Sequence, residues 1–170
     1  MEILWIIAAL FIAILIFNAV KVKITARKLS AEKFHLDEAQ QTEYAEKLGK
    51  MIRCKTVSIK GSYDDTEFAK LRKTMEELFP LVHEKSEKTV FGDDCWIYKI
   101  EGKDKTRNIM LMSHHDVVAA NGEWKHPEFC GEIHDGALWG RGTVDTKTSL
   151  FAEFAAIEEL LSEGFIPECN

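Results

Sequence analysis

The chain has 170 residues, and its content of 46% hydrophobic and 29% charged side chains is ordinary for a globular protein. Its net charge of −6 argues against nucleic acid as a partner, because domains that bind nucleic acid carry an excess of Lys and Arg. The sequence shows neither an internal repeat nor a low-complexity tract, so a repeat architecture is not expected.

The first 20 residues are far more apolar than the rest of the chain. Between Ile3 and Val20 only Asn18 has a clearly polar side chain. A helix over this run would be about 27 Å long, close to the ~30 Å hydrocarbon core of a membrane. A cleaved signal peptide is the alternative, but Glu2 stands where a signal peptide has basic residues, and the run exceeds the usual ~7–15 apolar residues. We therefore predict a single-pass membrane anchor over residues 1–20, with residues 3–20 in the membrane.

A basic juxtamembrane linker is predicted over residues 21–36. It contains Lys21, Lys23, Arg27 and Lys28, whereas only Met1 and Glu2 precede the span. Basic residues beside a membrane meet anionic lipid headgroups. Because positive charge collects on the cytoplasmic side, this pattern places the residues after the span in the cytoplasm.

Two amphipathic helices are predicted at the start of the domain over residues 37–170. The first, over 37–52, has its apolar side chains on one stripe. The second opens near Asp64, whose spacing to Glu67 resembles a capping box, and it ends at Pro80. Short strands are then predicted at 90–91, 96–100 and 109–112, and the order of these elements predicts an α/β layer fold.

Polar side chains follow the last of these strands, which has the apolar composition of a buried strand in a parallel or mixed sheet. In extended chain, alternate residues share a face, so His114 and Asp116 would point one way and His115 the other. Asp116 could then accept the spare ring N–H of His114, and this contact makes an imidazole a better metal ligand. On its own, this spacing more often marks a histidine hydrogen-bonded in a polar loop.

A second group of chemically suggestive residues lies about thirty positions later. Ile133–Trp139 has the pattern of a hairpin with a tight Asp-Gly turn, and Gly140-Arg141-Gly142 follows it. Asp145 directly precedes a helical pattern of apolar residues between Thr146 and Glu163. A carboxylate at that position suits a helix cap, and it could also bridge two cations.

These motifs, HxDVV at 114–118 and DGxLWGRGxxDxK at 135–147 with Trp124 between them, resemble a family of zinc exopeptidases. The family includes carboxypeptidase S, aminoacylase, glutamate carboxypeptidase and succinyl-diaminopimelate desuccinylase. The resemblance covers roughly residues 38–170 and is densest at 111–147, and it is greatest to the carboxypeptidase S and N-acyl-amino-acid hydrolase branch. Ala119 and Thr148 depart from residues that are common in the family.

The resemblance implies a fold, a cofactor and roles for three residues. The fold would be the N-terminal portion of a three-layer catalytic domain, preceded by the transmembrane helix. Two zinc ions, or cobalt or manganese in their place, would be bound. His114 would ligate one ion, Asp145 would bridge both, and Asp116 would orient His114 as the catalytic partner. Arg141 and Lys147 match the motif and are expected to support the structure, for instance by pairing with carboxylates.

The family's general base is the first glutamate of a Glu-Glu pair that follows the next strand, and no pair in this chain matches it. Glu158-Glu159 lies inside the last predicted helix and is interpreted as a solvated face. We therefore expect a truncated catalytic domain that lacks the general base and the remaining ligands and is inactive alone. Whether the truncation is natural or reflects an incomplete reading frame stays open.

The predicted function of the complete protein is hydrolysis of an amide bond in a small peptide or an N-acyl amino acid. The alternatives are a membrane-anchored remnant without catalysis, which binds a partner or nothing, and a hydrolase with a single metal ion. Members of the resembled branch can be secreted or lumenal, so the side of the membrane stays open, as do the oligomeric state and the substrate preference.

The four cysteines, at positions 54, 95, 130 and 169, form no CxxC pair. Their spacing gives poor support for a structural zinc site, and a chain of this length does not need disulfides to fold. We expect isolated, reduced thiols.

Overall fold

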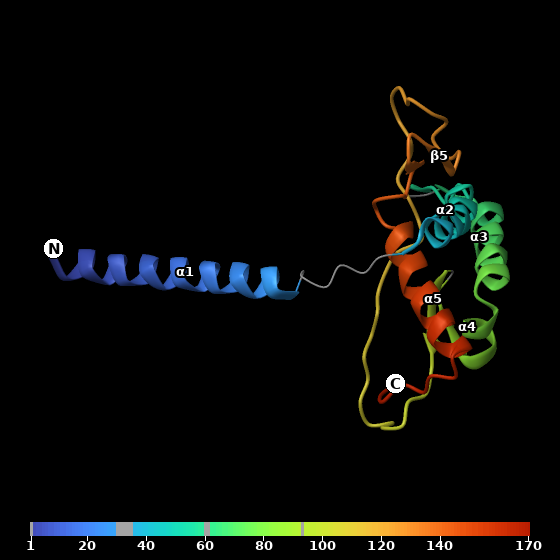
Figure 1. The fold of residues 1–170 in the computed structure, drawn as a ribbon. Helices are drawn as coiled ribbons and strands as arrows, with labels where there is room; N and C mark the ends of the chain where they lie inside the picture. Colours follow the sequence, from blue (N-terminus) through green and yellow to red (C-terminus); the bar gives the residue numbers. More distant parts are fainter. Residues whose placement is uncertain (1, 30–35, 60–61, 93) are drawn as a thin grey trace. The chain divides into compact units, whose positions relative to one another are not determined.

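The computed structural model describes residues 2–29, 36–59, 62–92 and 94–170. The chain divides into two compact units, Met1–Glu38 and Ala39–Asn170 (Figure 1). The first unit contains helix α1 (Glu2–Leu29), and the second contains the other helices and strands.

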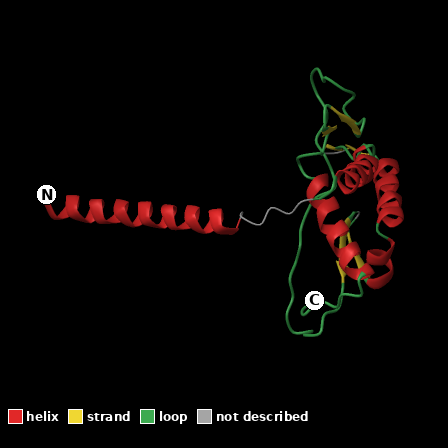
Figure 2. Cartoon of the chain, in the orientation of Figure 1, coloured by secondary structure: helices red, strands yellow, loops and turns green. Residues whose placement is uncertain are grey.

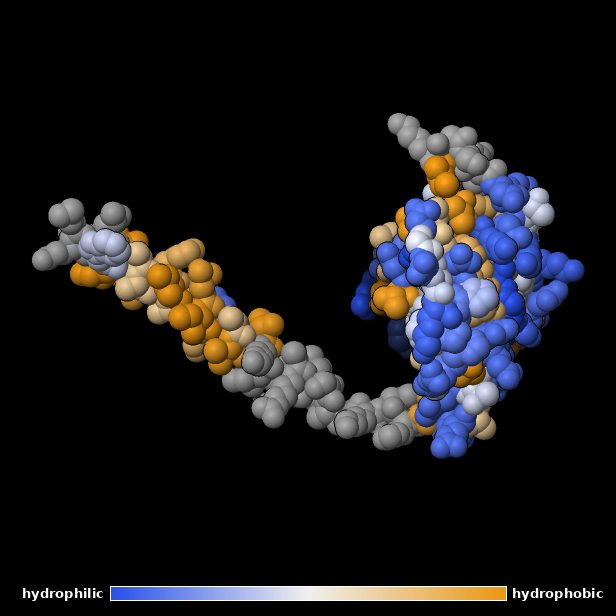
Figure 3. Space-filling view, turned by 90° about the horizontal axis from the view of Figure 1, so that it is seen from above, coloured by the Kyte–Doolittle hydropathy of each residue, from blue (hydrophilic) through white to orange (hydrophobic). Residues whose placement is uncertain are grey.

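Helix α1 is long and apolar enough to cross a membrane. Its most apolar stretch, Trp5–Val22, has a mean hydropathy of 2.4, and none of it is buried. These side chains cover α1 in orange in Figure 3. A signal sequence near the N-terminus passes the same test of length and hydropathy. The helix also continues to Leu29, into the segment predicted as a linker, because no Gly or Pro interrupts it. The rest of that linker, at 30–35, lies outside the described residues.

The second unit is a mixture of helices and strands, which is compatible with the predicted α/β class (Figure 2). In chain order it contains α2 (Glu38–Ile52), β1 (Ser58–Ile59), β2 (Ser62–Tyr63), α3 (Asp65–Leu78), α4 (Pro80–Lys85), β3 (Glu87–Phe91), β4 (Cys95–Lys99), β5 (Glu132–His134), β6 (Ala137–Trp139) and α5 (Lys147–Ser162). The strands form three antiparallel pairs, each joining consecutive strands. Helices α2, α3 and α5, strands β3 and β4 and the β5–β6 hairpin follow from local sequence patterns, whereas α4 and the β1–β2 hairpin were not predicted.

The core of this unit lies between the helices. Phe151 of α5 packs edge-on against Tyr44 of α2 at 5.8 Å and lies 5.9 Å from Phe79, where α3 ends. Phe154 reaches Tyr98 of β4, which places the β3–β4 hairpin against the same helix. The buried side chains of this cluster are Leu48, Met51, Ile52, Cys54, Leu71, Met75, Phe79, Val82, Leu150 and Phe151. Helix α5 is therefore held from several sides, and its first turn carries the residues that follow Asp145.

The interpretation of Glu158-Glu159 as a solvated face is wrong for Glu158. Its carboxylate accepts hydrogen bonds from the backbone N–H groups of Leu81 (3.0 Å) and Val82 (2.9 Å), in the first turn of α4. The first N–H groups of a helix have no partner within it and attract a carboxylate. The sequence did not reveal this contact because Pro80, expected only to end a helix, is also the first residue of α4.

The predicted buried strand at 109–112 is also wrong, since these residues form no strand and are exposed, with Met112 at 80%. A strand needs neighbours for its backbone and for both faces. Among the described residues, this stretch makes a backbone hydrogen bond only at its start, where Ile109 donates to the carbonyl of Asn170 (2.8 Å). An isolated parallel bridge between Asp104 and Cys169 precedes it in the chain. The remainder is drawn as a long loop in Figure 2.

Candidate metal centre

The segment around His114 is fixed by backbone pairing with the residues after α2. The N–H of Val117 donates to the carbonyl of Thr56 (2.8 Å), and the N–H of Ser58 donates to the carbonyl of Val117 (3.0 Å). The buried hydroxyl of Thr56 donates to the carbonyl of His115 (2.7 Å). The loop that carries His114 is therefore attached to the core although it belongs to no regular strand.

His115 points away from the candidate site, as the alternation of side chains predicted. Its ring stacks on Trp96 of β4 at 5.2 Å and meets Phe68 of α3 edge-on at 5.4 Å. Its Nε2 lies 3.0 Å from the carbonyl oxygen of Asp94. This histidine is part of the packing between α3 and the β3–β4 hairpin.

The imidazole of His114 lies between two carboxylates. Its Nδ1 is 3.1 Å from Oδ1 of Asp116 and 3.0 Å from the Asp116 carbonyl oxygen, and its Nε2 is 3.0 Å from Oδ1 of Asp145. All three side chains are accessible, with Asp145 exposed at 86%. Partial burial lowers the pKa of His114, but the hydrogen bonds and charges of Asp145 and Asp116 outweigh it and raise the pKa above 6.5.

Asp145 is delivered by the β5–β6 hairpin and the glycine turn behind it. Asp135 and Gly136 both have positive φ, as a tight primed hairpin turn requires. Gly140 follows with φ +149°, and a Cβ there would come within 2.4 Å of Ile52. Only glycine lets the chain pass this close to the end of α2. Asp145 then precedes Thr146, the N-cap of α5, and the peptide bond between them is cis.

Lys147 anchors the first turn of α5 in the core. Its side chain is fully buried, and its Nζ donates to the carbonyls of Met51 (3.0 Å) and Cys54 (2.6 Å). Burial lowers its pKa from 10.5 to about 8. The expectation that Lys147 pairs with carboxylates is therefore corrected, because its ammonium group donates hydrogen bonds to backbone carbonyls at the end of α2. The guanidinium of Arg141 lies 5.0 Å from the Trp124 ring.

The donor set around His114 suits a divalent cation. Two ligand atoms of a tetrahedral zinc ion lie roughly 3.4 Å apart, given bonds of about 2.0–2.2 Å. The His114 Nε2 to Asp145 Oδ1 separation of 3.0 Å is close to that value, so an ion could enter with little backbone movement. Asp116 on the other ring nitrogen completes the carboxylate–histidine pair that often supports a metal. The role of these residues as ligands stays a prediction.

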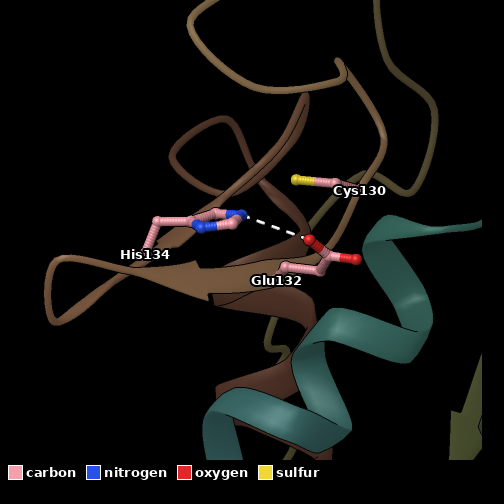
Figure 4. Close-up of side chains that lie close together, drawn as sticks. All are labelled: Cys130, Glu132 and His134. Atoms are coloured by element: carbon pink, nitrogen blue, oxygen red, sulfur yellow. Dashed lines mark hydrogen bonds and ion pairs between the residues drawn. The ribbon is translucent and has the colours of Figure 1, made fainter.

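A shallow hollow of about 290 Å³ adjoins Asp145, lined also by Trp124 and residues 138–144. A further group of ligand-type side chains, Cys130, Glu132 and His134, lies together near the start of the β5–β6 hairpin (Figure 4). Cys130 was expected to be an isolated thiol, but two other ligand-type side chains lie beside it. The alternate spacing 130, 132, 134 was the signal that could have revealed the group.

Comparison with known proteins assigns the family. A model of peptidase family M20/M25/M40 matches residues 110–170. Over 133 residues the chain is 35% identical to probable carboxypeptidase S-like 2 of Dictyostelium discoideum, with 74% of this chain and 26% of that protein covered. It is 36% identical over 145 residues to carboxypeptidase S of Saccharomyces cerevisiae, with 77% and 25% covered. An N-fatty-acyl-amino acid synthase/hydrolase of Homo sapiens is 35% identical over 121 residues, with 68% and 24% covered.

The chain belongs to the M20/M25/M40 peptidase family and corresponds to the N-terminal part of its members. It spans about a quarter of the length of these three curated relatives. By name, two of these relatives are carboxypeptidases, one of them called probable, and the third is an N-fatty-acyl-amino acid synthase/hydrolase.

Proposed function

We propose that the whole protein is a metal-dependent hydrolase that cleaves an amide bond in a small peptide or an N-acyl amino acid. The observation that carries this proposal is the His114 imidazole held between the carboxylates of Asp116 and Asp145. The relatives support the substrate class by name, since one is a carboxypeptidase and another an N-fatty-acyl-amino acid synthase/hydrolase.

The proposed cofactor is a pair of zinc ions, for which cobalt or manganese could substitute. When bound, such ions polarise the scissile carbonyl and lower the pKa of a bound water toward about 7. His114 would hold one ion through Nε2, and the exposed carboxylate of Asp145 would bridge both. Asp116 would keep the Nδ1 proton of His114, so that the Nε2 lone pair faces the ion.

Several residues of this chain would prepare the site without touching the reacting atoms. Lys147 ties the first turn of α5 to the end of α2 and so restricts where Asp145 can lie. The hollow lined by Trp124 and Trp139 adjoins that carboxylate and offers apolar surface to part of a substrate. The general base, the further ligands and the remainder of a three-layer domain would come from outside residues 1–170.

We further propose that the chain as given does not turn over substrate. One imidazole and one bridging carboxylate are too few ligands to hold two ions, because zinc sites in enzymes use about three protein ligands per ion. Turnover of an N-acyl amino acid by the isolated chain, abolished by a chelator and restored by zinc, would contradict this proposal.

We also propose that α1 anchors the protein in a membrane.

The test of the metal site uses a matched pair of variants in the whole protein, Asp145→Asn and Asp135→Asn. Both remove one exposed carboxylate of the same hairpin region, but Asp135 pairs with Lys125 at the turn, away from His114. Elemental analysis should find fewer zinc ions per chain in Asp145→Asn and an unchanged content in Asp135→Asn. Full zinc content in Asp145→Asn would refute the bridging role, and a wild-type protein without zinc would favour the non-catalytic alternative.

A further inference from the structure

Three chemically different metal-ligand side chains converge beside the β5–β6 hairpin. The sulfur of Cys130, a carboxylate oxygen of Glu132 and an imidazole nitrogen of His134 all lie within 4.8 Å of one another. Glu132 and His134 stand two residues apart on β5 and share a face, and Cys130 precedes them by the same spacing. In Figure 4 the three donor atoms point toward a common space, and His134 Nε2 is 3.2 Å from Glu132 Oε2.

The backbone under this cluster is held by α2. Arg53 donates from Nη1 to the carbonyl of Gly131 (2.8 Å), the residue between Cys130 and Glu132. Gly49 of α2 and Gly131 approach so closely that a Cβ on Gly49 would come within 2.4 Å of the Gly131 carbonyl oxygen. A site attached to a rigid element in this way keeps its ligands in place before an ion arrives.

The side chains are also restrained from the hairpin side. The ring of His126 lies flat on that of His134, with centroids 3.8 Å apart and an interplanar angle of 2°, which limits rotation of His134. Trp139 Nε1 donates to the His134 carbonyl (3.2 Å), and the Cys130 thiol makes a weak contact of 3.4 Å to the Trp139 carbonyl. The thiol and the imidazole have therefore only weak or replaceable partners, which an ion could displace.

We propose that Cys130, Glu132 and His134 form a binding site for a zinc-class divalent cation, separate from the pair His114 and Asp145. A thiolate, a carboxylate and an imidazole favour Zn²⁺, Co²⁺ or Cd²⁺, whereas Mg²⁺ and Ca²⁺ require oxygen ligands. Water would complete the tetrahedron. On binding, the Cys130 thiol releases its proton to solvent. Bonds to the ion replace the hydrogen bond between His134 and Glu132 and the weak contact from Cys130 to the Trp139 carbonyl.

The site would stabilise the chain between Cys130 and His134 by joining its two ends through one ion. This stretch leads directly into the turn and glycines that deliver Asp145. The site does not depend on the proposed hydrolase function, because it shares none of the residues assigned to the hydrolytic centre.

The experiment is a Co²⁺ titration of the reduced full chain, monitored by near-ultraviolet absorption. A bond between thiolate and cobalt gives a charge-transfer band that imidazole and carboxylate ligands do not give. The band should appear in the wild-type chain and in Cys95→Ser, which removes an exposed thiol from β4. It should be lost in Cys130→Ser. No band in the wild-type chain, or an unchanged band in Cys130→Ser, would overturn the proposal.

Two further variants keep the test decisive if Cys130→Ser is misfolded by circular dichroism. Glu132→Gln changes an exposed side chain and should keep the band while weakening Co²⁺ affinity by at least about tenfold, since losing even an outer partner of a ligand costs that much, and His134→Gln should weaken it at least as much. Unchanged affinity in both would refute the three-residue site. The band should persist in Asp145→Asn, even if the proposed hydrolytic centre is wrong, and its loss there would refute a separate site.

Discussion

Replacing Lys147 by methionine tests how the first turn of α5 is anchored. The lysine side chain is fully buried, and its pKa is lowered from 10.5 to about 8, chiefly by burial. A shift of this size corresponds to about 3 kcal/mol between the charged and neutral forms. Methionine has a similar length and removes the charge, but it leaves the carbonyls of Met51 and Cys54 without a donor, at about 1–3 kcal/mol each.

The pH dependence of stability separates the cost of burying the charge from the loss of the two hydrogen bonds to the carbonyls. Because the pKa is lower in the folded state, the unfolded state binds more protons between pH 8 and 10.5, so the free energy of unfolding rises with pH in that window. Between pH 7 and 10 this group should add about 2–3 kcal/mol to the stability of the wild-type chain and nothing to that of Lys147→Met. The stability difference between the two proteins should therefore widen by that amount.

The assay is urea unfolding of the reduced full chain in detergent at pH 7 and pH 10, monitored by circular dichroism. Groups other than Lys147 titrate in both proteins, so their effects cancel in the difference. Lys70→Met is the control, because Lys70 also donates to a backbone carbonyl, that of Arg53, from a side chain that is 52% exposed. Its effect should stay within about 0.5 kcal/mol at both pH values. A Lys147→Met difference that does not change with pH would refute the buried-charge reasoning.

Two further predictions concern the candidate metal centre and its support. Asp116→Asn should weaken zinc affinity of the whole protein about 10–100-fold without changing its fold, measured by competition with a chelator, because the carboxylate partner of His114 is lost. Unaltered affinity would exclude Asp116 as the orienting group. Gly49→Ala should lower the free energy of unfolding by about 1–3 kcal/mol in urea, since its Cβ would meet the Gly131 carbonyl oxygen. Wild-type stability in that variant would show that α2 and the β5 segment are not in close contact.

Local patterns in the sequence were sufficient for most of the regular elements. Helices α2, α3 and α5 follow from apolar stripes, and the β5–β6 turn follows from Asp135-Gly136 with both φ values positive. The alternation of side chains also predicted that His115 points away from His114. Each of these features depends on residues within about four positions of one another, and that is the distance over which periodicity and turn chemistry act.

Features that depend on distant partners could not be predicted in this way. The apolar composition of 109–112 predicted a buried strand, but a strand exists only where other strands pair with it, and these residues are exposed. Glu158 caps α4 because packing brings α4 to α5, and Cys130 joins Glu132 and His134 because α2 holds the intervening glycine.

From its sequence alone, the chain could be assigned an apolar N-terminal helix, an α/β class and, through its two motifs, a family. The tertiary structure alone decided that the Nε2 of His114 and the Oδ1 of Asp145, 31 residues apart, lie within 3.0 Å, and that Lys147 donates to carbonyls rather than to carboxylates. The physical reason is that these contacts join residues far apart in the sequence. The packing of α2 against α5 and the glycine turn determines which groups meet, and a buried donor must have an acceptor among them.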